Sequence, residues 1–394
     1  MTARGADAKW GGMTECSAAP DGVTGAGVLP DHELRAATTE GWITAPVPLG
    51  DEQFQPASLD LRLGPIAYQL RASFLPFRES VQDRLDGDGD LVIDRLSLAD
   101  GATLQRGSVY LVPLLESLTL PPGIRGRSNP KSTTGRLDIF TRVITDRTPR
   151  FDEIASGYRG PLYLEISPQS FPVRVHAGAS LNQLRLLVGD GAVSDATLRE
   201  IYEAGPLLYD DDARPVPAAH VTFNDGLCMG VDLSGRATGG VIGYRAHPNP
   251  PAVDLARVGH YDPAEFWEPI KRPSRDAYIL EANRFYILVS KERIRVPPEY
   301  AAEMVVYDAG AGEIRTHYAG FFDPGFGFGD GSVLGTKVVM EVRAREVPFL
   351  VYDGQTSFKV GFERLRSRPG RVYGVGLRSS YQHQTLSLSK HFKR

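Results

Sequence analysis

One short run of this chain carries the residue types that proteins use to bind phosphate groups. The run KSTTGR contains a glycine, the cations Lys131 and Arg136, and the hydroxyls of Ser132, Thr133 and Thr134. A guanidinium can form two parallel hydrogen bonds to a phosphate, hydroxyls can donate to its oxygens, and glycine lets the backbone approach closely. The spacing is not that of the Walker loop, G-x-x-x-x-G-K-S/T. A polar turn between strands would account for the same composition.

A glutamate on a later strand is a candidate for proton transfer. Glu165 lies in the run YLEIS, between the apolar residues Leu164 and Ile166. A carboxylate buried on such a strand would have its pKa raised toward neutrality, which suits an acid or base catalyst. The alternation of the strand also places Glu165 and Tyr163 on one face, which would be either a pocket or a solvated surface.

The composition excludes several classes of function. The formal net charge of −4 gives no basis for binding nucleic-acid polymers or membrane surfaces. The two cysteines, Cys16 and Cys228, are too few for a disulfide framework or a cysteine-rich zinc site. No apolar stretch reaches the roughly 18 residues that span a membrane. We therefore expect a cytoplasmic protein.

The elements that must position these side chains are predicted to be strands. The 42 glycines and 29 prolines separate short runs of Val, Ile, Leu, Tyr and Phe, which is typical of an all-β chain with tight turns and a few short helices. Helices are expected at 29–43 and 195–205. Residues 1–25 are small and polar, and we expect them to be disordered. The 394 residues are enough for two domains.

The second half of the chain repeats the first. YILVSKERIRVPPEY is similar to LVPLLESLTLPPGI, and TKVVMEVRAREVPFLVYDGQ is similar to PLYLEISPQSFPVRVHAGA. Pro121 and Glu165 are 44 residues apart, as are Pro297 and Glu341. The pattern predicts two copies of one β-domain. Their predicted bounds are 26–205 and 221–394, with 206–220 as a linker; two unrelated β-domains with common strand patterns are the alternative.

The first copy resembles the dCTP deaminase branch of the dUTPase-like family. Its opening helix, VLPDHELRAATTEGWI, is followed in the family's order by PASLDLRLG, LESLTLPPGI, the phosphate loop KSTTGRLDI, the catalytic strand YLEIS, and VRVHAGASLNQLRLL. One departure is Lys131, which stands where the family often has arginine. The resemblance implies that each copy is a distorted β-barrel or jelly roll, and that chains assemble as trimer-based homo-oligomers.

The resemblance also implies an activity, the hydrolytic deamination of dCTP to dUTP and ammonia, which supplies dUTP for dTTP synthesis. Lys131, Ser132, Thr133 and Arg136 would hold the triphosphate, and Glu165 would activate water against C4 of cytosine. Mg2+ would be bound through the triphosphate, with no metal ligand from the protein. Zinc is not expected, because the H-x-E and P-C-x-x-C ligands of zinc deaminases are missing from the sequence.

The base-reading residues are less clearly placed by the resemblance. Thr145, Asp146 and Arg147 lie near the family's base-reading turn. Extra residues in this stretch leave Asp152 as an alternative aspartate and Arg150 as an alternative arginine.

The second copy lacks the phosphate loop but keeps other features. HYAGFFDPGFG retains His317 and Asp323 and is closer to the family's base-reading turn, and Glu341 stands where Glu165 stands in the first copy. Family sites lie between subunits, so one site could combine the first copy's loop with the second copy's turn. We expect a structural role for Glu341 and leave Asp323 open.

The C-terminal tail resembles the family's closing segment. Tyr381, Gln384 and Lys390 are its candidate lid residues, and a frayed basic tail is the alternative.

Other activities of the same fold remain open. A dUTP diphosphatase closes its site with a Gly-rich tail, which this chain lacks, and needs no glutamate aimed at cytosine. Glu165 and the tail therefore favour deamination. A bifunctional enzyme that forms dUMP and a non-catalytic protein that binds dCTP, dUTP or dTTP are the remaining alternatives.

Overall fold

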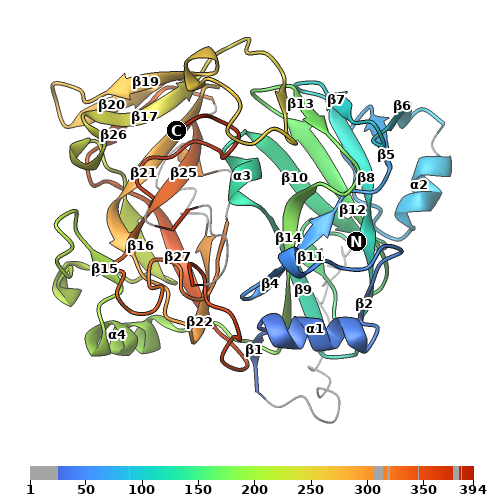
Figure 1. Cartoon of the computed structure of the whole chain (residues 1–394), viewed down its shortest axis with the longest axis horizontal. Coiled ribbons are helices and arrows are strands. Elements are labelled where there is room, and N and C mark those ends of the chain that lie inside the picture. Colours follow the sequence, from blue (N-terminus) through green and yellow to red (C-terminus); the bar gives the residue numbers. More distant parts are fainter. Residues whose placement is uncertain are drawn as a thin grey trace, which may run out of the picture.

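The computed structural model describes residues 25–87, 89–305, 314–316, 320–344, 346–375, 381–382 and 384–394. In these ranges the protein consists of two β-units that lie side by side, one coloured blue to green and the other yellow to red (Figure 1). The predicted all-β class with a few short helices is confirmed. None of the described helices is long and apolar enough to cross a membrane. Disorder was predicted for residues 1–25, and residues 1–24 lie outside the described part of the chain.

The first copy is built from two antiparallel six-stranded sheets. Buried and partly exposed residues alternate from Pro113 to Thr119, as expected for a strand with one face in the core. One sheet contains β1 (Gly27–Val28), β3 (Phe54–Gln55), β4 (Ser58–Arg62), β9 (Ile124–Pro130), β11 (Glu153–Ile154) and β14 (Ser180–Val188). The other contains β2 (Ile43–Thr44), β5 (Ile66–Leu70), β6 (Val92–Ser97), β8 (Val109–Thr119), β10 (Ile139–Thr145) and β12 (Arg159–Pro168).

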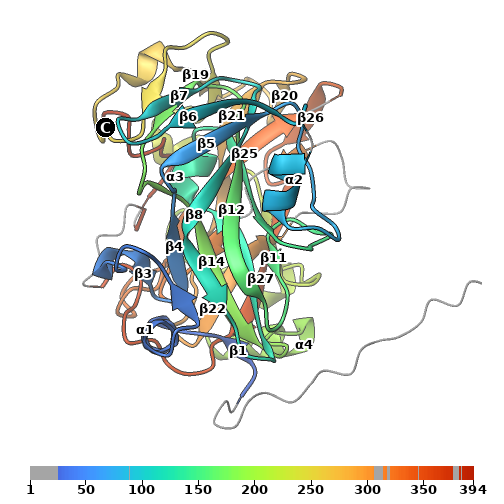
Figure 2. The ribbon, with the colours of Figure 1, turned by 90° about the vertical axis from the view of Figure 1, so that its right-hand side faces the viewer.

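Three short helices accompany these sheets. They are α1 (Asp31–Thr39), α2 (Val81–Gly87) and α3 (Ser132–Gly135). Helix α1 is followed by Gly41, whose φ of +77° is a left-handed conformation that glycine adopts at low cost. Helix α2 lies on the side of the first copy that faces away from the second, whereas α3 lies between the copies (Figures 1 and 2).

The second copy repeats this arrangement. One sheet contains β15 (Leu208–Tyr209), β17 (Val241–Ala246), β19 (Trp267–Lys271), β21 (Phe285–Ile294), β23 (Ile314–Thr316) and β25 (Thr336–Ala344). A second sheet contains β16 (Leu227–Gly230), β22 (Tyr300–Val305), β24 (Phe321–Phe322) and β27 (Thr356–Arg364). In a third, β20 (Ala277–Leu280) pairs with β26 (Phe349–Tyr352). Glu165 of β12 pairs with Leu111 of β8, and Glu341 of β25 pairs with the corresponding residue of β21, Ile287. The matching register confirms the predicted duplication.

The boundary between the copies differs from the prediction. Helix α4 (Asp195–Ala204) was assigned to the first copy, but its Leu198 and Tyr202 are buried in the core of the second. The predicted linker 206–220 contains β15, which pairs with β21. Its Asp211 also forms an ion pair of 2.6 Å with the buried Lys337. This segment is therefore part of the second unit, because its apolar and charged side chains have partners there.

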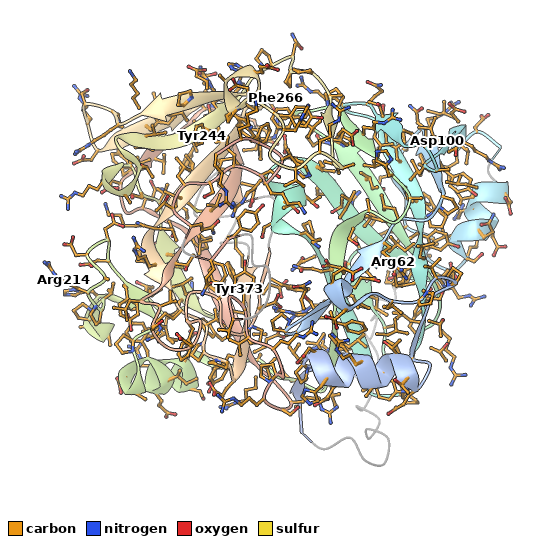
Figure 3. All side chains as sticks on the ribbon, viewed as in Figure 1. Arg62, Asp100, Arg214, Tyr244, Phe266 and Tyr373 are labelled. Carbon is orange, nitrogen blue, oxygen red and sulfur yellow. The ribbon has the colours of Figure 1, made fainter. Side chains whose placement is uncertain are left out.

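The two copies share one hydrophobic core at their junction. β13 (Val173–Val175) of the first copy pairs on one side with β7 (Ala102–Leu104) and on the other with β18 (Val253–Asp254) of the second. Beside this sheet, Phe171 makes edge contacts with Phe266 and Trp267 at centroid distances of 5.9 and 5.1 Å. Phe392 of the tail packs on Phe266 at 5.2 Å. Phe266 lies at the top of the molecule, near the boundary between its halves (Figure 3).

This shared core predicts that the copies unfold together. Phe171→Ala should lower the free energy of unfolding by about 3–5 kcal/mol, because it removes a buried aromatic ring and leaves a cavity. We expect a single transition in urea, followed by both near-UV circular dichroism and tryptophan fluorescence. Two separated transitions in the wild-type protein, or an unchanged midpoint in the variant, would show that the copies are independent.

Candidate active site

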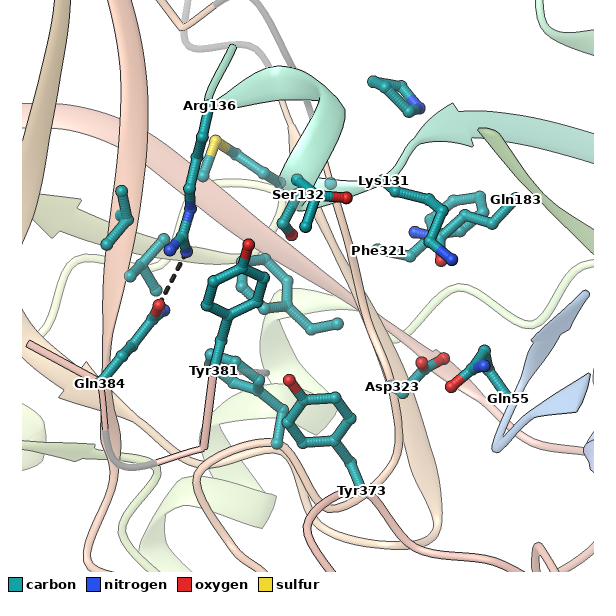
Figure 4. Close-up of a pocket in the computed structure, with 18 of the residues that line it drawn as sticks. Gln55, Lys131, Ser132, Arg136, Gln183, Phe321, Asp323, Tyr373, Tyr381 and Gln384 are labelled. Atoms are coloured by element: carbon teal, nitrogen blue, oxygen red, sulfur yellow. Dashed lines mark hydrogen bonds between the residues drawn. The ribbon is translucent and has the colours of Figure 1, made fainter. Parts of the chain in front are cut away.

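A cavity of about 360 Å3 lies between the copies. Its size is in the range of small-molecule binding sites. The first copy contributes the predicted phosphate loop, and the second contributes β25, the turn after β24 and the tail (Figure 4). Eight predicted site residues line it: Lys131, Ser132, Thr133, Arg136, Asp323, Tyr381, Gln384 and Lys390. The structure thus brings together the first copy's loop and the second copy's aspartate, as the resemblance allowed.

The phosphate loop is a single helical turn that begins where β9 ends. Lys131 is extended, with φ −69° and ψ 147°, and Ser132 to Gly135 form α3. Thr134 is buried and donates its hydroxyl to the carbonyl of Leu181 at 2.8 Å, so this hydroxyl anchors the loop. The first amides of a helical turn have no acceptor within the helix. The loop can therefore offer amides as well as the hydroxyls of Ser132 and Thr133 to an anion.

Arg136 is held by the C-terminal tail. Its guanidinium donates to Oε1 of Gln384 at 2.7 Å and to the carbonyl of Ser387 at 3.1 Å. It also lies 3.8 Å from the ring centroid of Tyr381. Figure 4 shows Tyr381 and Gln384 on the same side of this guanidinium. The tail is thus packed over the loop, where a lid would lie.

Glu341 faces Arg136 from the opposite copy. Its Oε1 is 3.9 Å from Nε of Arg136, and both side chains are almost completely buried. Burial raises the pKa of Glu341 to about 8, and Arg136 opposes that shift. A carboxyl group that exchanges protons near neutral pH suits acid–base catalysis.

Three other charged groups of the cavity, Asp323, Asp60 and Lys390, also have shifted pKa values. Burial raises the pKa of Asp323 to about 6, while Arg185 opposes the shift. Lys131 pairs with Asp60, whose pKa is raised by burial. Burial lowers the pKa of Lys390, and the neighbouring Lys131 adds to the effect.

Glu165 does not line this cavity. Its Oε1 accepts a hydrogen bond of 2.9 Å from Nε of Arg142, the residue opposite it on β10. The Arg142 guanidinium stacks on Phe151 at 3.6 Å from the ring centroid. Glu165, predicted to be the catalytic residue, is therefore not beside the loop in this cavity. The glutamate at the loop is Glu341, for which we had expected a structural role.

Thr145, Asp146 and Arg147 also lie away from the cavity. Asp146 accepts a hydrogen bond of 2.8 Å from the amide of Val81 at the start of α2, and the amide of Arg147 donates to Glu79 at 3.0 Å. These residues hold the segment around α2, on the outer side of the first copy. The turn that reaches the cavity is the second copy's, with Asp323. His317 lies outside the described residues.

Several lining residues were not predicted, among them Tyr373, Gln183, Gln55, Asp60, Phe321 and Phe322. Asp60 lies in SLDLRLG and Gln183 in the run after the catalytic strand, so both belong to stretches that carry the family resemblance. Phe321 and Phe322 lie in HYAGFFDPGFG, the stretch that is similar to the family's base-reading turn. Tyr373 lies in no such stretch, and aromatic residues of this kind are often part of a core.

Comparison with known proteins agrees with this arrangement. Residues 25–190 match the N-terminal domain of 2'-deoxycytidine 5'-triphosphate deaminase, and residues 194–392 match its C-terminal domain. The chain belongs to the 2'-deoxycytidine 5'-triphosphate deaminase family. The boundary between the two matches also lies before α4, where the packing of that helix places it.

Individual members of the deaminase family are similar over different lengths. The crystal structure of 2'-deoxycytidine 5'-triphosphate deaminase from Agrobacterium tumefaciens is 42% identical, with a TM-score of 0.80, and the match covers 86% of this chain and 99% of that one. The "dCTP deaminase, dUMP-forming" of Mycobacterium leprae is 31% identical over 165 residues, which are 41% of this chain and 80% of the relative. The protein of the same name from Mycobacterium avium is 30% identical over the same lengths.

The protonation of Glu341 predicts a pH-dependent stability difference. Its pKa is about 8 when folded and near the ordinary 4.5 when unfolded, so the folded state binds the proton more tightly. The stability that this provides is fully present below pH 4.5 and is lost as pH rises through 8. Relative to wild type, Glu341→Gln should therefore gain stability between these values, by up to about 1.4 kcal/mol per pH unit.

Urea denaturation at several pH values measures this difference. Glu203→Gln, at an exposed position on α4, is the control and should show no such trend. A difference between Glu341→Gln and wild type that stays constant from pH 5 to pH 8.5 would contradict the assignment.

Proposed function

We propose that this protein deaminates dCTP hydrolytically in the cavity between its two copies. The observation that carries the proposal is the meeting of Arg136 and Glu341 at 3.9 Å across the junction. It places a proton-exchanging carboxyl group beside a loop equipped for phosphates, in a chain of the deaminase family. A site with only the loop would support binding without chemistry.

In this proposal, one group of residues binds the triphosphate and Glu341 transfers protons. The hydroxyls of Ser132 and Thr133, together with the cations Lys131 and Arg136, anchor the triphosphate. Glu341 as carboxylate takes a proton from water, and the water oxygen bonds to C4 of cytosine. The carboxyl group gives this proton to N3, which leaves a hydroxyl group on C4. It then takes the proton of that hydroxyl and gives it to the amino group, so that the C4–N bond breaks and ammonia leaves as the C4 carbonyl forms. Burial supports this role, because a pKa near 8 lets one group accept and return a proton.

We propose that the nucleotide binds with Mg2+ on its phosphates. The cavity fits such a complex, because its three cations, Lys131, Arg136 and Lys390, are offset by the acidic groups Glu52, Asp60 and Asp323 even when Glu341 is protonated. These cations alone do not neutralise a triphosphate. The metal would supply the missing positive charge.

The product of the reaction is a second question that the relatives raise. Proteins named as dUMP-forming match 41% of this chain, so hydrolysis of the phosphates after deamination is the second candidate activity. We propose dUTP as the product, because the predicted deamination needs only the loop and Glu341.

The first test is to incubate the purified protein with dCTP and Mg2+ and to separate the nucleotides by ion-exchange chromatography. We expect dUTP with one ammonia per turnover. Formation of dUMP and pyrophosphate from dCTP would establish the second candidate. Intact dCTP together with hydrolysis of added dUTP would replace the proposal with a dUTP diphosphatase, and no change in either nucleotide would leave a binding protein.

The second test compares the two glutamates. Glu341→Gln should lower kcat by about 10²- to 10⁴-fold, the usual contribution of a general base, and should leave nucleotide affinity within a few-fold of wild type. Glu165→Gln is the matched control at the corresponding position of the first copy and should retain nearly full activity. The opposite result, with Glu165→Gln inactive and Glu341→Gln active in folded proteins, would move the chemistry to the first copy.

A further inference from the structure

One arginine of the first copy reaches fully into the second. Arg185 lies on β14, and its side chain is completely buried. It donates to the carbonyl of Ala302 and to the carbonyl of Phe322, both at 2.9 Å. Its guanidinium also lies 3.9 Å from the ring centroid of Phe321 and 3.7 Å from Oδ1 of Asp323. Arg185 thus contacts three consecutive residues of the turn that carries Asp323 into the cavity.

The repeat shows that this contact is not a general feature of the fold. Arg185 pairs with Arg127 in the first copy, and the corresponding pair in the second copy is Gly361 with Glu303. The second copy therefore has no side chain where the first has a buried guanidinium. The contact exists in one direction only, toward the copy that supplies Asp323.

We propose that Arg185 is a positioning residue that holds Phe322 and Asp323 in place at the wall of the active site. A buried guanidinium without partners is costly, so the two carbonyls and the nearby carboxylates must be fixed around it. Its planar fork fixes direction as well as distance, because it bonds two carbonyl oxygens at once. The inference rests on the proposed function and adds to it that Asp323, which lines the cavity, contacts the bound nucleotide.

The charges around Asp323 come from several elements. Arg185 faces it from β14, and Asp60 faces it from β4. Tyr373, in the segment before the tail, also interacts with it, and Glu363 of β27 lies 3.9 Å from Arg185. Of these groups only Arg185 is a cation, and it lowers a pKa that burial otherwise raises. Replacing Arg185 with a neutral residue should therefore raise the pKa of Asp323.

The experiment compares Arg185→Met, Arg185→Lys and the matched control Arg127→Met. Arg127 is a second arginine that crosses the junction, with Glu363 at 2.5 Å and Glu303 at 3.1 Å, and it makes no contact with the turn that holds Asp323 in the described structure. Both Met variants remove an ion pair between the copies. Only Arg185→Met removes the contacts of Arg185 with the turn that holds Asp323, while the hydrogen bonds from Ala57 and Ser58 to Asp323 remain in both variants. Stability and positioning can therefore be separated.

We expect Arg185→Met to lower kcat/KM for dCTP at least tenfold, mainly through KM, and Arg185→Lys to recover part of the loss. The kcat/KM of Arg127→Met should stay within twofold of the wild-type value, even if its melting temperature falls as much as that of Arg185→Met. On the acid side, Glu341 sets a decline of kcat/KM below about pH 8, and Asp323 sets a second, steeper decline below about pH 6. This second decline, the acid limb of Asp323, should move to higher pH in Arg185→Met and stay in place in Arg185→Lys. In an Asp323→Asn background, Arg185→Met should cost less than a further twofold.

Three results would overturn the proposal. The first is a loss of kcat/KM that parallels the fall in melting temperature in both Arg185→Met and Arg127→Met. The others are an acid limb of Asp323 that does not move in Arg185→Met, and a loss of kcat/KM on Arg185→Met that is as large in the Asp323→Asn background as in wild type. If Arg185→Met does not fold, the same comparisons are made with Arg185→Lys, for which the proposal requires a raised KM. A crystal structure of the folded Arg185 variant without nucleotide tests the positioning role independently of turnover. Displacement of Phe322 and Asp323 is expected even if wild type fails to deaminate dCTP, and an unmoved turn would refute the positioning role.

Discussion

The site depends on the burial of one guanidinium and one carboxyl group against each other across the junction of the two copies. Arg136 comes from the first copy and Glu341 from the second, and neither copy contains both. Charges removed from water need partners with good geometry. Gln384 and the carbonyl of Ser387 satisfy Arg136, while Glu341 relieves its burial by binding a proton more tightly. The property that makes Glu341 a candidate catalyst is therefore a consequence of where the two units meet.

The rest of the fold keeps the two units in this relation. The sheet that joins β13 to β18 and the aromatic contacts of Phe171 make the copies one core on one side of the site. Arg185 fixes the second copy's turn on another side. The tail closes the arrangement, because Gln384 bonds Arg136 and also donates to the carbonyl of Lys337 on β25. Each of these contacts joins the first copy to the second.

The duplicated halves have kept different parts of one site. The first copy retains the loop, and its own glutamate, Glu165, is paired with Arg142 of the same sheet. The second copy has lost the loop's hydroxyls and arginine but holds its glutamate at the cavity. The two corresponding glutamates therefore have different surroundings. Glu165 faces an arginine of its own sheet, Arg142, whereas Glu341 faces an arginine of the other copy, Arg136.

The sequence predicts features that depend on local patterns, but not those that depend on how the two copies are placed. The strand class and the repeat are local patterns, and the structure shows both of them. The loop and the tail are local patterns too, and residues of both line the cavity. Choosing between Glu165 and Glu341 was beyond such patterns, because both lie on similar strands with the same pairing register. Their surroundings depend on how the copies are placed, as do the assignment of α4 to the second core and the contacts of Arg185. Thr145, Asp146 and Arg147 do not line the cavity, because the turn that reaches it belongs to the other copy.

The central claim is that one nucleotide is bound by the first copy's loop and acted on by the second copy's glutamate. A crystal structure of the Glu341→Gln protein with dCTP and Mg2+ tests it most directly. The account predicts the triphosphate on Ser132, Thr133 and Arg136 of α3, with C4 of cytosine within hydrogen-bonding reach of residue 341 through one water. A nucleotide whose base lies instead against Glu165 and Arg142 would contradict it.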